Sequence, residues 1–257
     1  MQGARFACLV VTGLVLFACP TLAQAQKEAD PDPPSIASVF SELGRDFHHL
    51  ASRDSALILL AAGGASLAVS HADDTITRRA VQSPTLETVL DQGSLMGDGA
   101  IQIGAAVSVY AFGRAVHNTR AAVLGADLLQ AQLVNGVLTQ TVKYAVNRTR
   151  PDGGRYSFPS GHASATFATA TVLTRQCGWR IGVPVLAMAG YVAASRLSEN
   201  QHFASDVIFG AGIGIVSGRS MTIRKTTIAL TVTPMPLHGG GVWIMLQEAK
   251  RPGGRSS

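Results

Sequence analysis

From about residue 38 to residue 220 the chain alternates apolar runs with short polar breaks, and the apolar positions recur with helical periodicity. Alanine and glycine are frequent within these runs, which favours close packing between helices. The pattern therefore predicts an all-α fold, a helical bundle. The expected helices cover residues 38–50, 54–71, 85–94, 98–117, 119–146, 161–176, 180–196 and 203–219.

The N-terminal segment has the pattern of a secretory signal. Arg5 is followed by an apolar stretch over residues 6–22 and then by Ala23-Gln24-Ala25, small residues typical of a cleavage site. An uncleaved anchor helix is one alternative, and lipid attachment at Cys19 is another. Cleavage after Ala25 would leave Cys177 as the only cysteine, so we expect the mature fold not to depend on a disulfide.

The C-terminal segment has a different pattern. After Arg224, a run rich in Thr, Val and Ile over residues 226–234 and an apolar run over residues 242–246 flank Gly239-Gly240-Gly241, which predicts a small C-terminal β-hairpin. We expect four parts: a signal peptide (1–25), a disordered, proline-rich leader (26–37), a helical domain (38–222) and a hairpin with its tail (223–257).

Charge excludes one class of function. The 21 Lys and Arg residues against 16 Asp and Glu give a net charge of +5 without a dense basic cluster, so we expect no nucleic-acid binding. Four arginines do gather in one part of the sequence, where they would attract a phosphorylated substrate. They are Arg148, Arg150, Arg155 and Arg196.

Three groups of residues between Lys143 and Asp206 have the chemistry needed to bind a phosphate and break its ester bond. A phosphoryl group in transit carries negative charge on its oxygens, which fixed cations stabilise. Arginine donates two parallel hydrogen bonds, and lysine adds a point charge. The groups are Lys143 with Arg150 and Pro151; Pro159-Ser160-Gly161-His162; and Ser195 and Arg196 with His202 and Asp206.

Two histidines allow one to attack phosphorus while the other protonates the departing oxygen. His202 and Asp206 are four residues apart, so on a helix they would share a face, and Asp206 could hold one ring nitrogen. Ser160 is expected to cap the helix that follows it, and the first amides of that helix form an anion site.

These residues resemble the three-part signature of the type 2 phosphatidic acid phosphatase and vanadium haloperoxidase superfamily: K-Y-A-V-N-R-T-R-P, P-S-G-H and S-R-L-S-E-N-Q-H-F-A-S-D. The resemblance implies that His202 is the nucleophile, Asp206 its partner and His162 the general acid. It also implies a phosphate cradle, which consists of Lys143, Arg150, Ser160, Gly161 and Arg196.

The expected activity is hydrolysis of phosphate monoesters through a phosphohistidine, on a phosphorylated small molecule or a lipid phosphate or pyrophosphate. No further His, Cys or Asp cluster has metal-binding spacing, so we expect no metal and no other cofactor. The link over residues 152–158 is short and leaves the substrate open. The alternatives are a vanadium-dependent haloperoxidase, a phosphotransferase to a lipid or sugar acceptor, and a non-enzymatic envelope component.

The apolar runs at 54–71, 98–113 and 181–195 are 15 to 18 residues long, at or below the ~20 needed to span a bilayer. The range 119–146 carries several polar residues, including Asp127 and Gln132, which are costly in lipid. Three crossings before Lys143 would also place the site on the side of the membrane opposite to residue 26. We therefore expect an exported protein on the periplasmic side, soluble or peripherally attached, with an integral membrane protein as the alternative. The oligomeric state does not follow from the sequence.

Overall fold

The structure is a computed structural model that describes residues 34–90, 93–220, 229–237 and 241–249. Its helices belong to one unit of the chain and its two strands to another. The elements are α3 (Ile36–Leu50), α4 (Arg53–Ser70), α5 (Asp73–Val81), α6 (Pro84–Leu90), α7 (Gly93–Gly97), α8 (Gly99–Ala115), α9 (Thr119–Val146), α10 (Gly161–Cys177), α11 (Trp179–Ser198), α12 (Ala204–Ser220), β1 (Ala229–Leu237) and β2 (Gly241–Ala249).

The all-α expectation is confirmed, and seven of the eight expected helices agree with observed ones to within two residues at each end. The expected helix 85–94 is instead two short helices, α6 and α7. The strands β1 and β2 pair antiparallel, with Ala229 opposite Ala249 and Leu237 opposite Gly241. The signal peptide and most of the leader fall outside the described residues, although α3 already begins at Ile36.

Helix α5 was not predicted, because its buried face is polar. Asp73 and Thr77 are buried on it together with Ala80, so apolar periodicity is missing. The helix begins with Asp73 and Asp74 and carries Arg78 and Arg79 in its last turn, a charge order that complements the helix dipole. That charge order is the feature of the sequence from which α5 could have been predicted.

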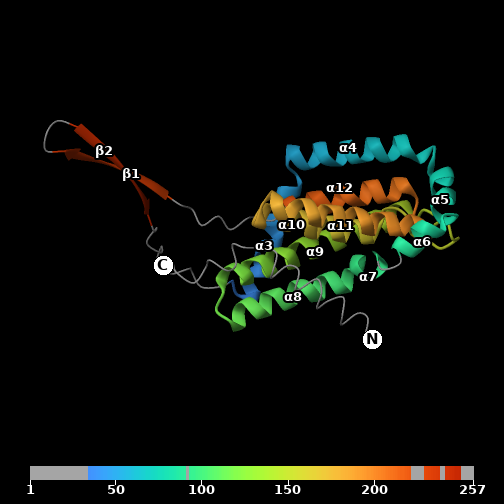
Figure 1. The fold of residues 1–257 in the computed structure, drawn as a ribbon, viewed down its shortest axis with the longest axis horizontal. Helices are drawn as coiled ribbons and strands as arrows, with labels where there is room; N and C mark the ends of the chain where they lie inside the picture. Colours follow the sequence, from blue (N-terminus) through green and yellow to red (C-terminus); the bar gives the residue numbers. More distant parts are fainter. Residues whose placement is uncertain (1–33, 91–92, 221–228, 238–240, 250–257) are drawn as a thin grey trace. The chain divides into compact units, whose positions relative to one another are not determined.

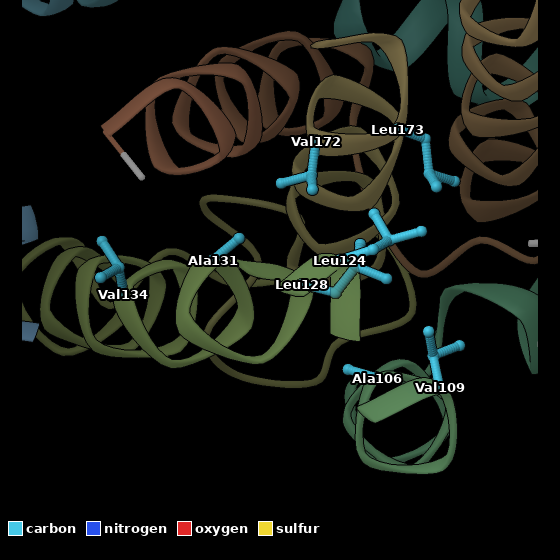
Figure 2. Packing of buried hydrophobic residues seen from close by; sticks show 8 residues of the cluster. All are labelled: Ala106, Val109, Leu124, Leu128, Ala131, Val134, Val172 and Leu173. Atoms are coloured by element: carbon cyan, nitrogen blue, oxygen red, sulfur yellow. The ribbon is translucent and has the colours of Figure 1, made fainter. Parts of the chain in front are cut away.

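The main apolar core lies between α8, α9 and α10 (Figure 2). Small side chains alternate with leucine and valine there, and burial of this surface is the main favourable term in folding. Its fully buried members are Ala106, Val109, Leu124, Leu128, Ala131, Val134, Val172 and Leu173.

A glycine face on α12 lets that helix approach α10 closely. Gly210, Gly214 and Gly218 follow one another at intervals of four residues, so they share one side of the helix. A Cβ atom on Gly210 would lie 2.6 Å from the Ser160 carbonyl oxygen, and one on Gly214 would lie 2.3 Å from that of Ser164. The contact places the first turns of α10 and α12 side by side, and the Ser160 N–H donates to the Asp206 carbonyl at 3.0 Å.

Several helices expose apolar faces. Helix α4 carries Leu57, Leu60 and Leu67, which are 64%, 71% and 69% exposed, and α11 exposes Trp179 and Val183. By length and composition three described helices could cross a membrane, namely α4, α9 and α11. Exposed apolar surface on this scale marks a membrane or protein contact, so it favours the integral membrane alternative over a soluble bundle.

The polar residues of α9 do not argue against a membrane, contrary to our expectation, because most of them face the interior. Asp127, Gln130, Gln132 and Asn135 are buried. The Gln132 side-chain amide donates to the Ala165 carbonyl at 2.9 Å, and that of Gln130 donates to the Val39 carbonyl at 2.8 Å. Hydrogen-bonded polar groups inside a bundle are compatible with a lipid-facing exterior.

Cysteine bonding in the full-length chain differs from what we expect for the cleaved chain. Cys177, the last residue of α10, is disulfide-bonded. The expectation rested on cleavage after Ala25, which would remove the other two cysteines of the chain.

Candidate active site

The three motif groups meet at one end of the helical unit. The loop between α9 and α10 and the loop between α11 and α12 lie at this end, together with the short helices α5, α6 and α7 (Figure 1). The end of α9 supplies Lys143, and the start of α10 supplies His162. The structure thus brings together residues that are far apart in the sequence.

Lys143 lies in the last turn of α9 and is 8% exposed. Its Nζ donates to the Tyr156 carbonyl at 2.7 Å, which ties the helix to the loop that leads into α10. The helix ends at Asn147, which adopts a left-handed conformation with φ of 46°. Asparagine tolerates this conformation better than most residues, so Asn147 turns the chain toward Arg150.

Arg150 is held by its own loop. Its N–H donates to the Gly154 carbonyl at 2.8 Å, and its guanidinium donates to the Gln201 side chain. Its Nε atom is buried and has no hydrogen-bond partner among the described residues. A buried donor of this kind is costly unless a ligand or water completes it. Arg150 therefore has a hydrogen-bond donor available for an anion.

Ser160 caps α10 as expected, because its Oγ accepts from the Ala163 N–H at 3.4 Å. Gly161 follows, and a Cβ atom there would lie 3.8 Å from Lys143 Cε. His162 is packed under α7, where a Cβ atom on Gly97 would come within 2.9 Å of the imidazole. The open end of α10 therefore lies between Lys143 and the His162 ring.

Arg196 is 4% exposed and pairs with Glu199. Its main-chain carbonyl accepts from the N–H groups of Gln201 and His202, at 3.1 and 3.2 Å. This residue therefore contributes a buried charge and also fixes the backbone that carries His202.

His202 and Asp206 do not share a helix, in contrast to our expectation. α12 begins only at Ala204, and the Asp206 carboxylate reaches back to accept from the Phe203 N–H at 2.9 Å, as in a capping box. His202 Nδ1 lies 3.7 Å from Asp206 Oδ2, an electrostatic contact longer than a hydrogen bond. The two side chains are almost fully buried, at 3% and 0% exposure. Asp206 thus faces one ring nitrogen of His202.

The pKa of His162 is lowered to about 4, first by burial and then by the positive charge of Arg196 and the neighbouring His202. His162 is therefore neutral at pH 7 when the site holds no anion. A bound phosphate would raise this pKa, because negative charge favours the imidazolium form.

Burial also lowers the pKa of His202, and Lys143 and Arg150 add to this effect while Asp206 opposes it. Burial alone would raise the pKa of Asp206. That pKa nevertheless lies below its ordinary value, because His202, Ser157, the Phe203 N–H and Arg148 favour the carboxylate. At neutral pH the pair is an uncharged imidazole beside a carboxylate.

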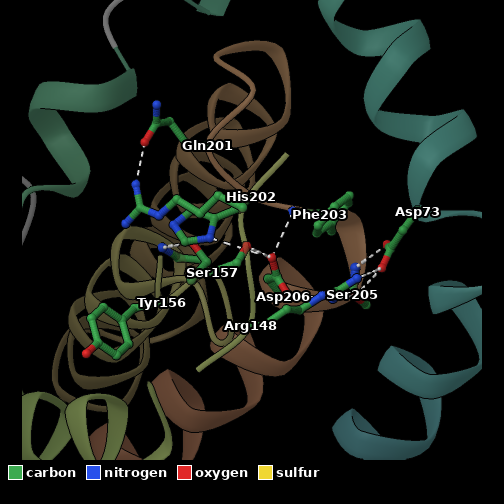
Figure 3. Close-up of polar contacts among 12 residues, drawn as sticks. Asp73, Arg148, Tyr156, Ser157, Gln201, His202, Phe203, Ser205 and Asp206 are labelled. Atoms are coloured by element: carbon green, nitrogen blue, oxygen red, sulfur yellow. Dashed lines mark hydrogen bonds and ion pairs between the residues drawn. The ribbon is translucent and has the colours of Figure 1, made fainter. Parts of the chain in front are cut away.

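Sequence reasoning missed the use of Arg148. We expected it to attract a substrate, but its guanidinium bonds to Asp206 and to Asp73 at 2.8 and 2.9 Å (Figure 3). Ser157, which donates to Asp206, was also missed. Asp73 lies 70 residues before Lys143 in a helix without apolar periodicity, so no motif connected it to the site.

Among the described residues no group of three His, Cys, Asp or Glu side chains could hold a metal ion. The cationic side chains at this site are Lys143, Arg150 and Arg196.

Comparison with known proteins gives a family match over the part of the chain that carries this site. Residues 124–228 match the model of the PAP2 superfamily. The chain is 34% identical over 162 residues to a lipid A 1-phosphatase of Porphyromonas gingivalis, a match that covers 60% of this chain and 35% of that protein. It is 30% identical over 177 residues to a PA-phosphatase related-family protein of Dictyostelium discoideum, covering 56% of this chain and 64% of that one.

A solved structure supports the fold. The transmembrane PAP2 type phosphatidylglycerolphosphate phosphatase of Bacillus subtilis superposes with a TM-score of 0.50 at 22% identity, over 71% of this chain and 92% of that one. The family match, the bundle and the three signature groups agree with one another. Residues 124–228 are therefore similar to the PAP2 superfamily, the type 2 phosphatidic acid phosphatases.

Proposed function

We propose that this protein is a membrane-embedded phosphatase that removes the phosphate from a phosphorylated lipid through a phosphohistidine on His202. One observation carries the proposal. A buried neutral histidine faces the Asp206 carboxylate through one ring nitrogen, within the electrostatic reach of Lys143 and Arg150. The second histidine, His162, lies within electrostatic reach of His202, whose positive charge lowers the pKa of His162.

Binding of the phosphate relies on fixed cations. Lys143, Arg150 and Arg196 offer positive charge from three different elements, and the unpartnered Nε of Arg150 offers a hydrogen-bond donor. Gly161 lies in the first turn of α10, where free amides favour an anion. Such preorganised donors stabilise charge on the transferring group without a metal.

In the first step His202 Nε2 forms a bond to phosphorus while the bond from phosphorus to the ester oxygen breaks. Nδ1 faces Asp206, so the Nε2 lone pair is available, and the positive charge that develops on the imidazole is matched by the carboxylate. His162 donates a proton to the departing oxygen. Since His162 is neutral in the empty site, the proton arrives with the phosphate, whose charge raises the pKa of this histidine.

In the second step water attacks phosphorus, and the bond from His202 to phosphorus breaks. His162, which is neutral after the first step, takes the proton from the water. Inorganic phosphate leaves, and both histidines return to their starting state.

A lipid substrate is supported by the exposed apolar faces of α4 and α11 and by the relatives, whose names include a lipid A 1-phosphatase. Together these observations favour a substrate whose tail stays in the bilayer while its phosphate reaches the end of the bundle.

We also propose that the site faces the periplasm. α4, α8 and α9 run in alternating directions, so the chain that enters α4 lies at the end opposite to the site (Figure 1). If these helices cross the bilayer, a periplasmic site places Arg53 at the cytoplasmic face. That arrangement places residue 26 on the cytoplasmic side, so it conflicts with export and cleavage after Ala25. It fits residues 6–22 as an uncleaved anchor whose N-terminus lies in the periplasm. The intact mass of the purified protein tests this: a chain starting at Gln26 would contradict it.

Phosphate release from phosphatidic acid and from p-nitrophenyl phosphate, in detergent micelles, tests the proposed activity. We expect turnover that a chelator leaves intact and orthovanadate inhibits, and complete loss in His202→Ala. His117→Asn is the matched control, because His117 lies between α8 and α9 with φ of 55°, a conformation asparagine accepts. Activity that disappears with chelator and returns with a divalent ion would contradict the mechanism.

The alternatives are separable in the same preparation. Vanadate, peroxide and bromide test for a haloperoxidase, and halogenation without phosphate release would replace our proposal. Acceptor alcohols test for phosphotransfer, which would divert product from free phosphate.

A further inference from the structure

Asp73 lies in the first turn of α5, and its side chain is only 3% exposed. Its carboxylate accepts from the Ser205 N–H at 3.0 Å, from the Ser205 hydroxyl and from Arg148 at 2.9 Å (Figure 3). Ser205 is in the first turn of α12, two residues after Phe203. Asp73 therefore caps α12 from a different helix, where negative charge also complements the dipole of α12.

Arg148 joins this carboxylate to that of Asp206. Its NH1 donates to Asp206 Oδ1 and to Ser205 Oγ, both at 2.8 Å, while its NH2 donates to Asp73. The guanidinium lies over the Phe203 ring, 4.2 Å from the centroid. A planar fork between two carboxylates holds both in fixed positions. The interactions of Arg148 are thus used within the protein rather than for a substrate.

The net charge of Asp73, Arg148 and Asp206 determines the electrostatic potential at the His202 imidazole. Arg148 alone would cancel the negative charge of Asp206, since the two groups are in contact. Asp73 returns the sum over the three side chains to a single negative charge. An imidazole that becomes positively charged during attack is stabilised by that charge.

We infer that Asp73 is a positioning residue, which acts through Arg148 to orient Asp206 and to preserve the negative charge that it presents to His202. The inference rests on the proposed function and adds to it a residue outside the matched region 124–228.

Other charged groups also face this pair. Lys143 from α9, Arg150 from the loop before α10 and His162 from α10 act on His202, and Lys143 acts on Asp206 as well. None of them contacts Asp73 in the described part of the chain. Substitutions at Asp73 and Arg148 therefore change the charge on the Asp206 side of His202 and leave Lys143, Arg150 and His162 in place.

Asp73→Asn and Arg148→Gln should act on His202 in opposite directions. Asp73→Asn keeps an oxygen for the Ser205 N–H but leaves Arg148 uncompensated, so the pKa of His202 falls. Arg148→Gln removes a positive charge, so this pKa rises. We expect shifts on the order of half to one pH unit. The double variant removes both charges and should return the pKa to near its wild-type value.

The test measures the pKa of His202 from ¹⁵N-histidine spectra of the full chain in micelles, assigned with His202→Ala, together with kcat and KM for p-nitrophenyl phosphate. Asp73→Asn should lower kcat about ten- to hundredfold, the usual loss when a group that orients a catalytic residue is removed. KM and inhibition by inorganic phosphate should change little. Asp54→Asn, which removes the exposed pair with Arg219, is the control for loss of a carboxylate.

Shifts of opposite sign that cancel in the double variant support the inference. Shifts of the same sign, or no shift in folded variants, overturn it and assign Asp73 a structural role only. A rise in KM and in the phosphate inhibition constant for Arg148→Gln would also overturn it, because Arg148 would then bind substrate. The ¹⁵N readout does not need turnover, so an inactive wild-type protein would contradict the proposed function without removing this test. If Asp73→Asn fails to fold, Arg148→Gln and the double variant decide the sign.

Discussion

Gly214 on α12 lies so close to the Ser164 carbonyl oxygen of α10 that a Cβ atom would stand 2.3 Å from it. The same face of α12 carries Gly210, which lies against the carbonyl of Ser160, the cap of α10. The spacing between these helices therefore determines where His162 lies relative to the start of α12. Packing deep in the bundle and geometry at the site are linked through this contact.

We expect Gly214→Ala to destabilise the protein by about 1–3 kcal/mol, because the methyl group must displace backbone rather than a flexible side chain. It should also lower kcat, since α10 and α12 separate. Thermal unfolding in micelles and phosphate release measure both effects. Gly190→Ala is the matched control, because no heavy atom lies within 4 Å of a Cβ atom there and helix propensity favours alanine. Equal stability of the two variants would show that the close approach is not required.

The sequence was sufficient to predict most of the helices and the residues of the signature. Apolar periodicity is local, so each long helix could be located on its own. The signature residues have a chemistry that few other combinations share. Asp73 could not be predicted in this way, because its relation to Arg148 depends on how α5 packs against the start of α12.

The same limit explains the errors about Arg148 and about α9. Composition shows that an arginine is present near the phosphate motifs, but only the fold shows that two carboxylates neutralise it. Composition likewise shows that α9 contains Asp127 and Gln130, but not that they face inward. A polar residue in a helix argues against a membrane only when its direction is known.

Fractionation of cells tests the membrane assignment. We expect the protein to stay in the membrane pellet through high salt and alkaline carbonate, because α4 and α11 expose leucine, valine and tryptophan that a bilayer would cover. A known periplasmic protein and a peripheral membrane protein serve as controls in the same extraction. Release by osmotic shock alone would restore the soluble alternative.

The lowered pKa of His162 predicts how stability depends on pH. The pKa is about 4 in the folded protein against 6.5 for an unperturbed histidine, so the unfolded chain binds more protons between these values. The contribution of His162 to the free energy of unfolding should therefore be fully present above pH 6.5 and be lost as the pH falls toward 4. His202, whose pKa is also lowered by burial, acts in the same direction.

Unfolding temperatures between pH 7.5 and 4.5 measure this dependence. His162→Asn should weaken it, because an amide does not titrate, while the contribution of His202 remains. Inorganic phosphate should weaken it in the wild type as well, since a bound anion raises the pKa of His162. An identical pH dependence in wild type and His162→Asn would contradict the pKa assignment.

The division of roles between the two histidines gives the most specific prediction about the reaction. His162→Ala should slow the first step little with p-nitrophenyl phosphate, because nitrophenolate is a good leaving group and needs no proton. The second step should slow by about 10²–10⁴-fold, since the water loses its general base. Phosphoenzyme should then accumulate, and rapid quenching at alkaline pH followed by mass spectrometry should find phosphate on His202. His202→Ala should form no phosphoenzyme with any substrate, because the imidazole that attacks phosphorus is removed. Phosphate on His162, or full steady-state activity of His202→Ala, would show that the roles are reversed or that another residue attacks.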